Sequence, residues 1–165
     1  TTEFLDYAST RLPNLTSTSI ADTVAYIADA ARAHASQKGV KFELQVPDTL
    51  LATADAGQLQ QALMNLVLNA VDASPAQGTI VLRARSQNQT VLIEVQNAGS
   101  PIPDAIRNRL FEPFFTTKPR GTGLGLAIAR NIARAQGGDL KLAENGPSCV
   151  RFSITLPAAS DHGQR

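Results

Sequence analysis

The glycine-rich run at residues 121–126 is the stretch of the chain best suited to bind a ligand through backbone groups. It reads Gly121, Thr122, Gly123, Leu124, Gly125 and Leu126, and apolar residues at helical spacing follow it. Glycines leave backbone amides open to a ligand, and a helix start adds unpaired N–H groups and a positive dipole end. This combination favours a phosphate. A turn that only caps a helix fits the same pattern, and no Walker-type Lys-Ser/Thr pair follows the glycines.

Two asparagines form a second candidate for chemistry. Asn65 and Asn69 lie four residues apart among apolar residues, so in a helix they share one face. Asparagine disfavours a helix interior by several tenths of a kcal/mol, roughly, relative to alanine. The pair therefore suggests a polar task, such as binding a hard cation through a carboxamide oxygen. Side chains that face water or cap local backbone explain the pair equally well.

The elements that must position these residues follow from periodicity. Apolar residues at helical spacing predict helices over residues 20–38 and 58–73, and a third that ends at Gly137-Gly138. Alternation predicts strands at 40–46 and 50–53, and hairpins at 79–85/91–95 and 139–144/149–156, the second turning at Asn145-Gly146. Residues 104–110 suit a short helix. The order predicts an α+β fold with helices on one face of a sheet.

Composition excludes several function classes. The chain has 165 residues, a formal net charge of +1 and one cysteine. This length suits one domain, and the charge gives no basic footprint for nucleic acid. A single cysteine rules out an internal disulfide and a cysteine metal cluster. No apolar stretch approaches the ~20 residues that span a bilayer, and no signal peptide opens the chain. We therefore expect an intracellular protein, and because the chain begins at Thr1 without a Met, we also expect it to be a piece of a longer one.

Four motifs in a fixed order give a specific resemblance. They read NLVLNA at residues 65–70, VQNAGSPIP at 95–103, FEPFF at 111–115 and GTGLGL at 121–126. The chain resembles, over about residues 55–157, the catalytic ATP-binding domain of bacterial sensor histidine kinases, in the wider family of gyrase-type ATPases. The resemblance implies a two-layer α/β sandwich with a mixed sheet. It also implies a remnant of the dimerisation helix and linker at 1–15, the ATP-binding domain at 16–158 and a polar tail at 159–165.

The resemblance also implies roles for particular residues, with ATP and Mg²⁺ as cofactors. Asn69 matches the asparagine that ligates Mg²⁺, and Asn65, Asn69 and Lys118 are expected to be catalytic. Residues 102–121 match a mobile lid over the nucleotide, from which Lys118 or Arg120 would reach the β- or γ-phosphate. The nucleotide-binding residues expected from the family are Asn69, Asp72, Asn97, Gly99, Ile102, Phe111, Phe115, Lys118, Arg120, Gly121, Thr122, Gly123, Leu124, Gly125 and Leu126.

The chain departs from the family pattern at two places. The family's D-x-G-x-G motif, whose aspartate accepts a bond from the adenine amino group, reads here from Asn97 to Pro101. A carboxamide accepts that bond without charge, so we expect Asn97→Asp to tighten ATP binding. Pro101 removes an N–H and flexibility from this loop. Secondly, related ATPases place a glutamate base at the position of Asn65, which cannot take a proton from water.

The function implied is to position Mg–ATP for phosphoryl transfer to a histidine in an upstream dimerisation domain. His34 and His162 do not match that acceptor. The expected partners are the dimerisation domain and a response regulator, with no nucleic acid. The full-length protein is expected to be a homodimer. This domain is expected to be cytoplasmic, within a full-length protein that is anchored to a membrane. A degenerate, nucleotide-free signalling module is the alternative, supported by Asn97 and Pro101. An ATPase or an anti-sigma type serine kinase is a third reading.

Overall fold

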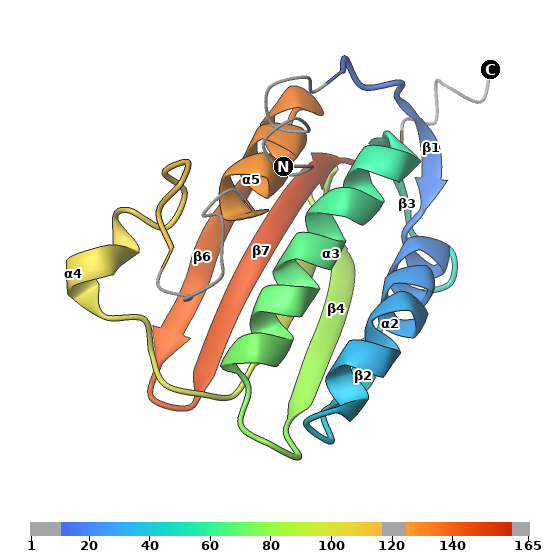
Figure 1. Ribbon diagram of the computed structural model, residues 1–165. Coiled ribbons are helices and arrows are strands. Elements are labelled where there is room, and N and C mark those ends of the chain that lie inside the picture. The colour runs from blue at the N-terminus through green and yellow to red at the C-terminus, as the bar shows by residue number, and fades with distance from the viewer. Residues whose placement is uncertain (1–10, 117–124, 160–165) are drawn as a thin grey trace.

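A five-stranded mixed sheet forms one layer of the fold (Figure 1). The structure is a computed structural model that describes residues 11–116 and 125–159. Across the sheet the strands are β2 (Lys41–Gln45), β4 (Thr79–Gln87), β5 (Thr90–Asn97), β7 (Cys149–Pro157) and β6 (Asp139–Gly146). β2 and β4 are parallel and the other neighbours are antiparallel. Both hairpins expected from alternation are therefore present.

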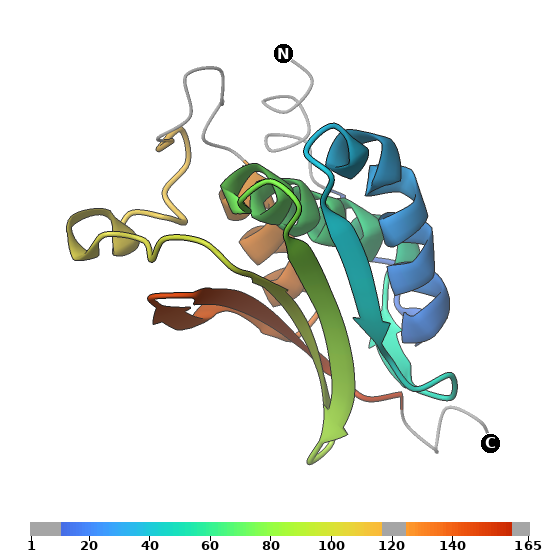
Figure 2. The same ribbon diagram turned by 90° about the horizontal axis from the view of Figure 1, so that it is seen from below.

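Three helices form the second layer and cover one face of this sheet (Figure 2). They are α2 (Ile20–Ser36), α3 (Ala56–Ala73) and α5 (Gly125–Ala135). In the part of the chain that the structure describes, no helix covers the opposite face. The short helix α4 (Asp104–Arg107) stands apart from the layer, beyond the edge of the sheet (Figure 1). This arrangement confirms the predicted α+β class with helices on one face.

Apolar residues from both layers meet in one core. Helical spacing places Ile27, Leu63 and Ile132 toward the sheet, and the alternation of the strands places Ile80 and Ile154 toward the helices. Each of these side chains is at most 2% exposed. Burying a side chain of this size contributes about 1.5–3 kcal/mol. The rigid contact of α3 with the sheet fixes the direction in which its polar face points.

Side-chain caps define the ends of α2 and α3. Ser19 Oγ accepts the N–H of Asp22 at 3.2 Å, and Asp55 accepts the N–H of Gln58 at 3.0 Å. At the other end of α3, Lys38 Nζ donates to three main-chain carbonyls, those of Val71 and residues 72 and 74. A cation at a helix C-terminus also complements the helix dipole.

A small second sheet, which the sequence did not predict, joins the N-terminal segment to the domain. β1 (Thr16–Ser19) pairs antiparallel with β3 (Leu51–Ala54). Residues 12–19 are rich in serine and threonine, a composition typical of a linker and not of a strand. Pairing supplies partners for the backbone of this segment and needs no apolar side chains from it. The predicted strand at 50–53 is confirmed as β3.

The segment before β1 is held by a buried carboxylate. Asp55 is 3% exposed and binds Arg11 through both oxygens, at 2.5 and 3.0 Å, and the N–H of Asn14 at 2.8 Å. Gln58 donates to the carbonyl of Arg11, and Gln136 accepts the N–H of Asp55. The Arg11 hydrogen bond lowers the pKa of Asp55 far below its ordinary value. Residues 11–14 thereby contact the start of α3.

The hairpin of β6 and β7 is longer than predicted. Asn145 pairs with Val150 and Gly146 with Cys149, so the turn lies at residues 147–148 and not at Asn145-Gly146. Asn145 stays in the strand, where its side chain bonds to a neighbouring loop. Among the described residues, no helix is long and apolar enough to cross a membrane.

Candidate functional site

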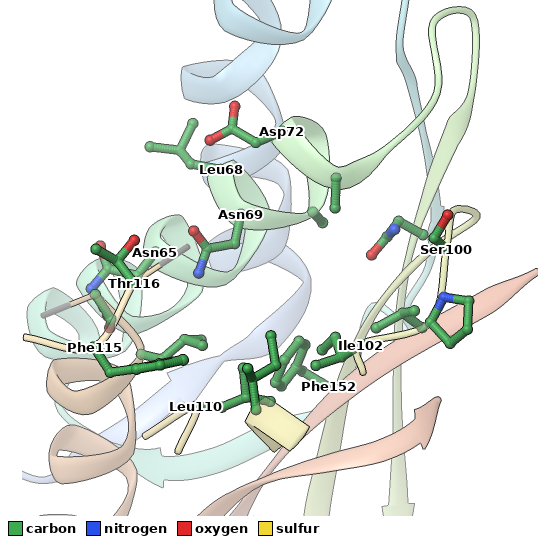
Figure 3. Close-up of a pocket in the computed structure, with 18 of the residues that line it drawn as sticks. Asn65, Leu68, Asn69, Asp72, Ser100, Ile102, Leu110, Phe115, Thr116 and Phe152 are labelled. Atoms are coloured by element: carbon green, nitrogen blue, oxygen red, sulfur yellow. Dashed lines mark hydrogen bonds between the residues drawn. The ribbon is translucent and has the colours of Figure 1, made fainter. Parts of the chain in front are cut away.

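A cleft with a volume of about 490 Å³ lies between α3, the loop after β5 and the beginning of α5. This size is ordinary for a small-molecule site. Of the predicted site residues, the following line it: Asn65, Asn69, Asp72, Asn97, Ile102, Phe115, Gly125 and Leu126. Figure 3 shows Asn65, Asn69 and Asp72 in succession along one wall, with Ile102, Leu110 and Phe152 across from them. The cleft therefore has one polar and one apolar wall.

The polar wall is the face of α3 that does not enter the core. Asn65 and Asn69 are half-buried, whereas Leu66 and Ala70 beside them are buried. Asn65 Nδ2 donates to the carbonyl oxygen of Gly125 at 3.1 Å. This bond ties α3 to the first residue of α5, which is the last glycine of the glycine-rich run. A glutamate at position 65 has no N–H for this bond, so the carboxamide has a structural use here.

The end of β5 carries the residue expected to meet the adenine base. Asn97 is 4% exposed and lines the cleft. Its Nδ2 donates to the carbonyl oxygen of Ala98 at 2.7 Å. With the amide nitrogen engaged, Oδ1 is the atom that a ligand can use as an acceptor. Gly99, two residues on, has a φ of +144°, and a Cβ there would lie 2.8 Å from the carbonyl oxygen of Ala73. Only glycine fits this approach to α3.

The phenylalanine motif divides between the cleft and its support. Phe111 packs edge-on against Phe152, with ring centroids 6.3 Å apart, and the guanidinium of Arg130 lies 4.5 Å from the Phe111 centroid. Phe152 lines the cleft and Phe111 stands behind it. Phe115 lines the cleft, and Arg109 lies 4.5 Å from its ring centroid. Such cation–π contacts contribute about 0.5–2 kcal/mol each and orient the rings.

Phe114 has the least usual conformation in this motif. Its φ is +70°, in the left-handed region that bulky residues rarely adopt, and its side chain is 58% exposed. Holding such a residue there costs on the order of 1–3 kcal/mol. The sequence motif places three phenylalanines together, and the structure gives each a different environment.

A contact between a histidine and an aspartate at the cleft was not expected from the sequence. His34 Nε2 lies 3.0 Å from Asp72 Oδ1, and both residues line the cleft with about half of each side chain exposed. His34 lies in the last turn of α2. Its approach to α3 depends on how the two helices pack, which helical periodicity alone does not reveal.

Some predicted residues lie elsewhere. Gly99 and Phe111 support the cleft and do not line it. The following lie outside the described residues: Lys118, Arg120, Gly121, Thr122, Gly123 and Leu124. The same holds for residues 1–10, most of the tail and His162. Apolar lining residues that sequence reasoning missed include Leu68 and Phe152. Phe152 also belongs to the hydrophobic core.

Comparison with known proteins identifies the family. The model of the family described as "Histidine kinase-, DNA gyrase B-, and HSP90-like ATPase" matches residues 54–160. The sensor protein FixL of Bradyrhizobium diazoefficiens is 36% identical over 126 residues, which are 74% of this chain and 25% of FixL. The sensor histidine kinase ZraS of Escherichia coli strain K12 is 36% identical over 124 residues, 74% of this chain and 27% of ZraS. The chain thus spans about a quarter of these relatives.

Solved structures agree with this grouping. The catalytic domain of the histidine kinase ThkA superposes with a TM-score of 0.80 at 31% identity, covering 87% of this chain and 95% of that one. Full-length ShkA in complex with AMPPNP gives a TM-score of 0.82 at 28% identity, covering 96% of this chain and 35% of ShkA. ThkA in complex with the response regulator TrrA gives 0.79 at 27% identity, covering 96% of this chain and 46% of that one. The chain belongs to the histidine kinase-, DNA gyrase B- and HSP90-like ATPase family, as the ATP-binding catalytic domain of a sensor histidine kinase.

Proposed function

We propose that this domain binds Mg–ATP in the cleft and presents the γ-phosphate to a histidine in a dimerisation domain upstream in the longer protein. The observation that carries the proposal is the bond between Asn65 and Gly125. It places the beginning of α5, where backbone amides favour a phosphate, beside Asn69 on α3. The apolar wall around Ile102 and Phe152 would hold the base.

Asn69 would hold the metal. Its carboxamide oxygen is a suitable ligand for Mg²⁺, which takes the rest of its shell from phosphates and water. The described residues contain no cluster of three His, Cys, Asp or Glu side chains for a metal, so the proposal relies on Asn69 and the nucleotide. Bound Mg²⁺ would neutralise charge on the phosphates. The protein's own share is then mainly positioning.

The transfer would take place within a larger assembly. We propose that the full protein is a homodimer and that its partner is a response regulator, as in the ThkA–TrrA complex. We further propose residues 1–15 as the junction with the dimerisation domain, 16–158 as the catalytic domain and 159–165 as a tail. The domain would work in the cytoplasm, and the full protein would be anchored to a membrane.

Titration calorimetry with ATP and ADP, with and without Mg²⁺, tests the proposal. We expect both nucleotides to bind. Mg²⁺ should increase the affinity for ATP more than that for ADP, because a triphosphate offers the metal more oxygens. A ligand at about 100 times its dissociation constant should also stabilise the fold by about 2.7 kcal/mol. If neither nucleotide binds at millimolar concentration, the nucleotide-free signalling module becomes the better account. The relatives, which are named as sensor kinases, do not favour that alternative.

A further inference from the structure

The loop from residue 98 to residue 103 forms one wall of the cleft and depends on a side chain from another part of the sheet. Ser100, Pro101, Ile102 and Pro103 line the cleft. Asn145 of β6 reaches the middle of this segment. Its Oδ1 accepts the N–H of Ile102 at 2.7 Å, and its Nδ2 donates to the carbonyl oxygen of Ile102 at 2.8 Å. One carboxamide thus satisfies both backbone polar groups of one residue.

The local sequence makes this contact decisive for the position of the loop. Pro101 and Pro103 have no N–H, so Ile102 carries the one amide donor of the three residues. A residue before proline is also confined to extended conformations, which stiffens Ile102. A stiff segment moves as a unit, so an anchor at its centre sets where the whole unit lies. Asn145 itself is held in the strand by its pairing with Val150.

We propose that Asn145 is a positioning residue for the nucleotide base, acting through Ile102. This role rests on the proposed function of the cleft. Asn145 does not line the cleft, whereas Ile102 does and packs against the core. Asn145 would therefore fix the position of Ile102 in the apolar wall without touching the ligand. Because Asn145 belongs to β6, the sheet would thereby set the distance between the wall at Ile102 and the wall formed by α3.

The chemistry of the contact restricts what can replace Asn145. A carboxamide offers a donor and an acceptor in one plane, whereas a carboxylate accepts only and alanine does neither. In Asn145→Asp, a carboxylate oxygen would face the Ile102 carbonyl oxygen in place of an N–H donor. Asn145→Ala removes both bonds. Ser148→Ala, at the exposed turn of the same hairpin, is the matched control.

Calorimetric titration of the wild-type domain and these three variants with adenosine, ADP and ATP tests the role. In Asn145→Ala we expect the affinities for all three ligands to fall by the same factor, about three- to tenfold, because two neutral hydrogen bonds that orient the wall are lost. Asn145→Asp should weaken them at least as much, and Ser148→Ala should leave them unchanged. The ratio of ATP to adenosine affinity should stay constant, because the phosphate end is untouched.

A second measurement does not depend on ligand. Amide hydrogen exchange of Ile102 should be slow in the wild type and much faster in Asn145→Ala, which has no acceptor for that N–H, whereas Asn145→Asp keeps an acceptor and should change the exchange less. Unchanged affinities and exchange in Asn145→Ala would overturn the role, as would a loss confined to ATP. If Asn145→Ala does not fold, the affinities of Asn145→Asp for the three ligands decide. If the wild type binds no nucleotide although its Ile102 amide is protected, the proposed function fails, and the role of Asn145 in base positioning fails with it.

Discussion

At the scale of single residues, Asn97 shows how a local bond changes an expectation drawn from the sequence. The carboxylate usual in the family would give a charged acceptor, whose hydrogen bond contributes ~1.5–3 kcal/mol against ~0.5–1.5 for a neutral one. In the structure, however, Nδ2 of Asn97 donates to the Ala98 carbonyl at 2.7 Å in a buried position. A carboxylate oxygen there would face that carbonyl oxygen. The gain at the base would therefore be offset by repulsion and by the burial of a charge.

This argument gives a pair of expectations for Asn97. Asn97→Asp should bind ATP no tighter than wild type and should lose about 1–3 kcal/mol of unfolding free energy. Asn97→Ala should bind ATP about fivefold more weakly, because one neutral acceptor is lost. Calorimetry with ATP and GTP, together with urea unfolding, measures both effects. A several-fold gain in affinity for Asn97→Asp at full stability would show that the bond to Ala98 does not orient the side chain.

In the proposed function Asn69 ligates the metal, so its substitution distinguishes the contribution of the metal to binding from that of the base. Asn69→Ala should weaken ATP in Mg²⁺ by about tenfold or more, since a ligand to a cation is lost. Adenosine, which has no phosphates, should bind nearly as well as to wild type. Gln60→Ala, on the same helix but outside the cleft, is the control. An equal loss for adenosine and ATP would mean that the helix itself is disturbed.

The sequence predicted which residues gather but not how they bond. The order of the motifs was sufficient to bring Asn65, Asn69 and Asn97 to one cleft. It could not reveal that Asn65 bonds to the Gly125 carbonyl or that His34 reaches Asp72, because both contacts join separate elements. Side-chain bonds of this kind depend on how helices pack, and periodicity reports only which face of each helix is buried.

At the scale of elements, periodicity predicted the helices and hairpins, whose patterns lie within one segment, and missed the strand β1, which pairs with a segment far along the chain. The helices α2, α3 and α5 and both long hairpins follow from patterns within each segment. β1 is polar, and its partner β3 lies some 35 residues away, so no local signal marks it as a strand. The turn at Asn145-Gly146 was placed wrongly for a related reason. The Asn-Gly pair is typical of turns, but Asn145 is held in β6, with its side chain on Ile102.

The start of α3 should be sensitive to acid. Because the ion pair with Arg11 lowers the pKa of Asp55 in the folded state, its contribution to stability is complete above the unfolded pKa near ~3.9 and is lost as the pH falls below it. Asp55→Asn keeps a capping oxygen but removes the charge. Its deficit in unfolding free energy relative to wild type should therefore be larger at pH 7 than at pH 3.

Urea unfolding of both proteins at the two pH values measures this. Asp55→Ala should lose about 1–2 kcal/mol for the cap alone at either pH. Asp48→Asn, in the exposed turn before β3, is the matched charge control. A deficit for Asp55→Asn that does not change with pH would mean that the carboxylate is not held ionised by its partners. Because Arg11 and Asn14 share this carboxylate, the same variant should loosen the segment before β1.

At the scale of the whole molecule, the proposed function requires that a phosphate acceptor from another domain be brought to the cleft. Phosphoryl transfer of this kind is mainly positioning and charge neutralisation, so the domain should hold ATP without consuming it. The residues that line the cleft come from the helical side of the sheet and from the loop that carries α4, so in the proposed function we expect the acceptor to approach from that side. In the proposed full protein, a tether would keep the acceptor near that side at a high effective concentration.

With radiolabelled ATP and Mg²⁺, we therefore expect the isolated domain to remain unlabelled. Adding the separate dimerisation domain should give slow, acid-labile labelling of that domain, at a rate that rises with its concentration because the tether is absent. Asn69→Ala should abolish this labelling. Within the domain itself, His34 is a candidate acceptor for the phosphoryl group, because it lines the cleft, where its Nε2 lies 3.0 Å from Asp72 Oδ1. Its Nε2 is engaged with a carboxylate, so we expect no transfer to it, and His34→Ala should leave the labelling of the dimerisation domain intact. Acid-labile label on His34 would instead make the domain its own substrate.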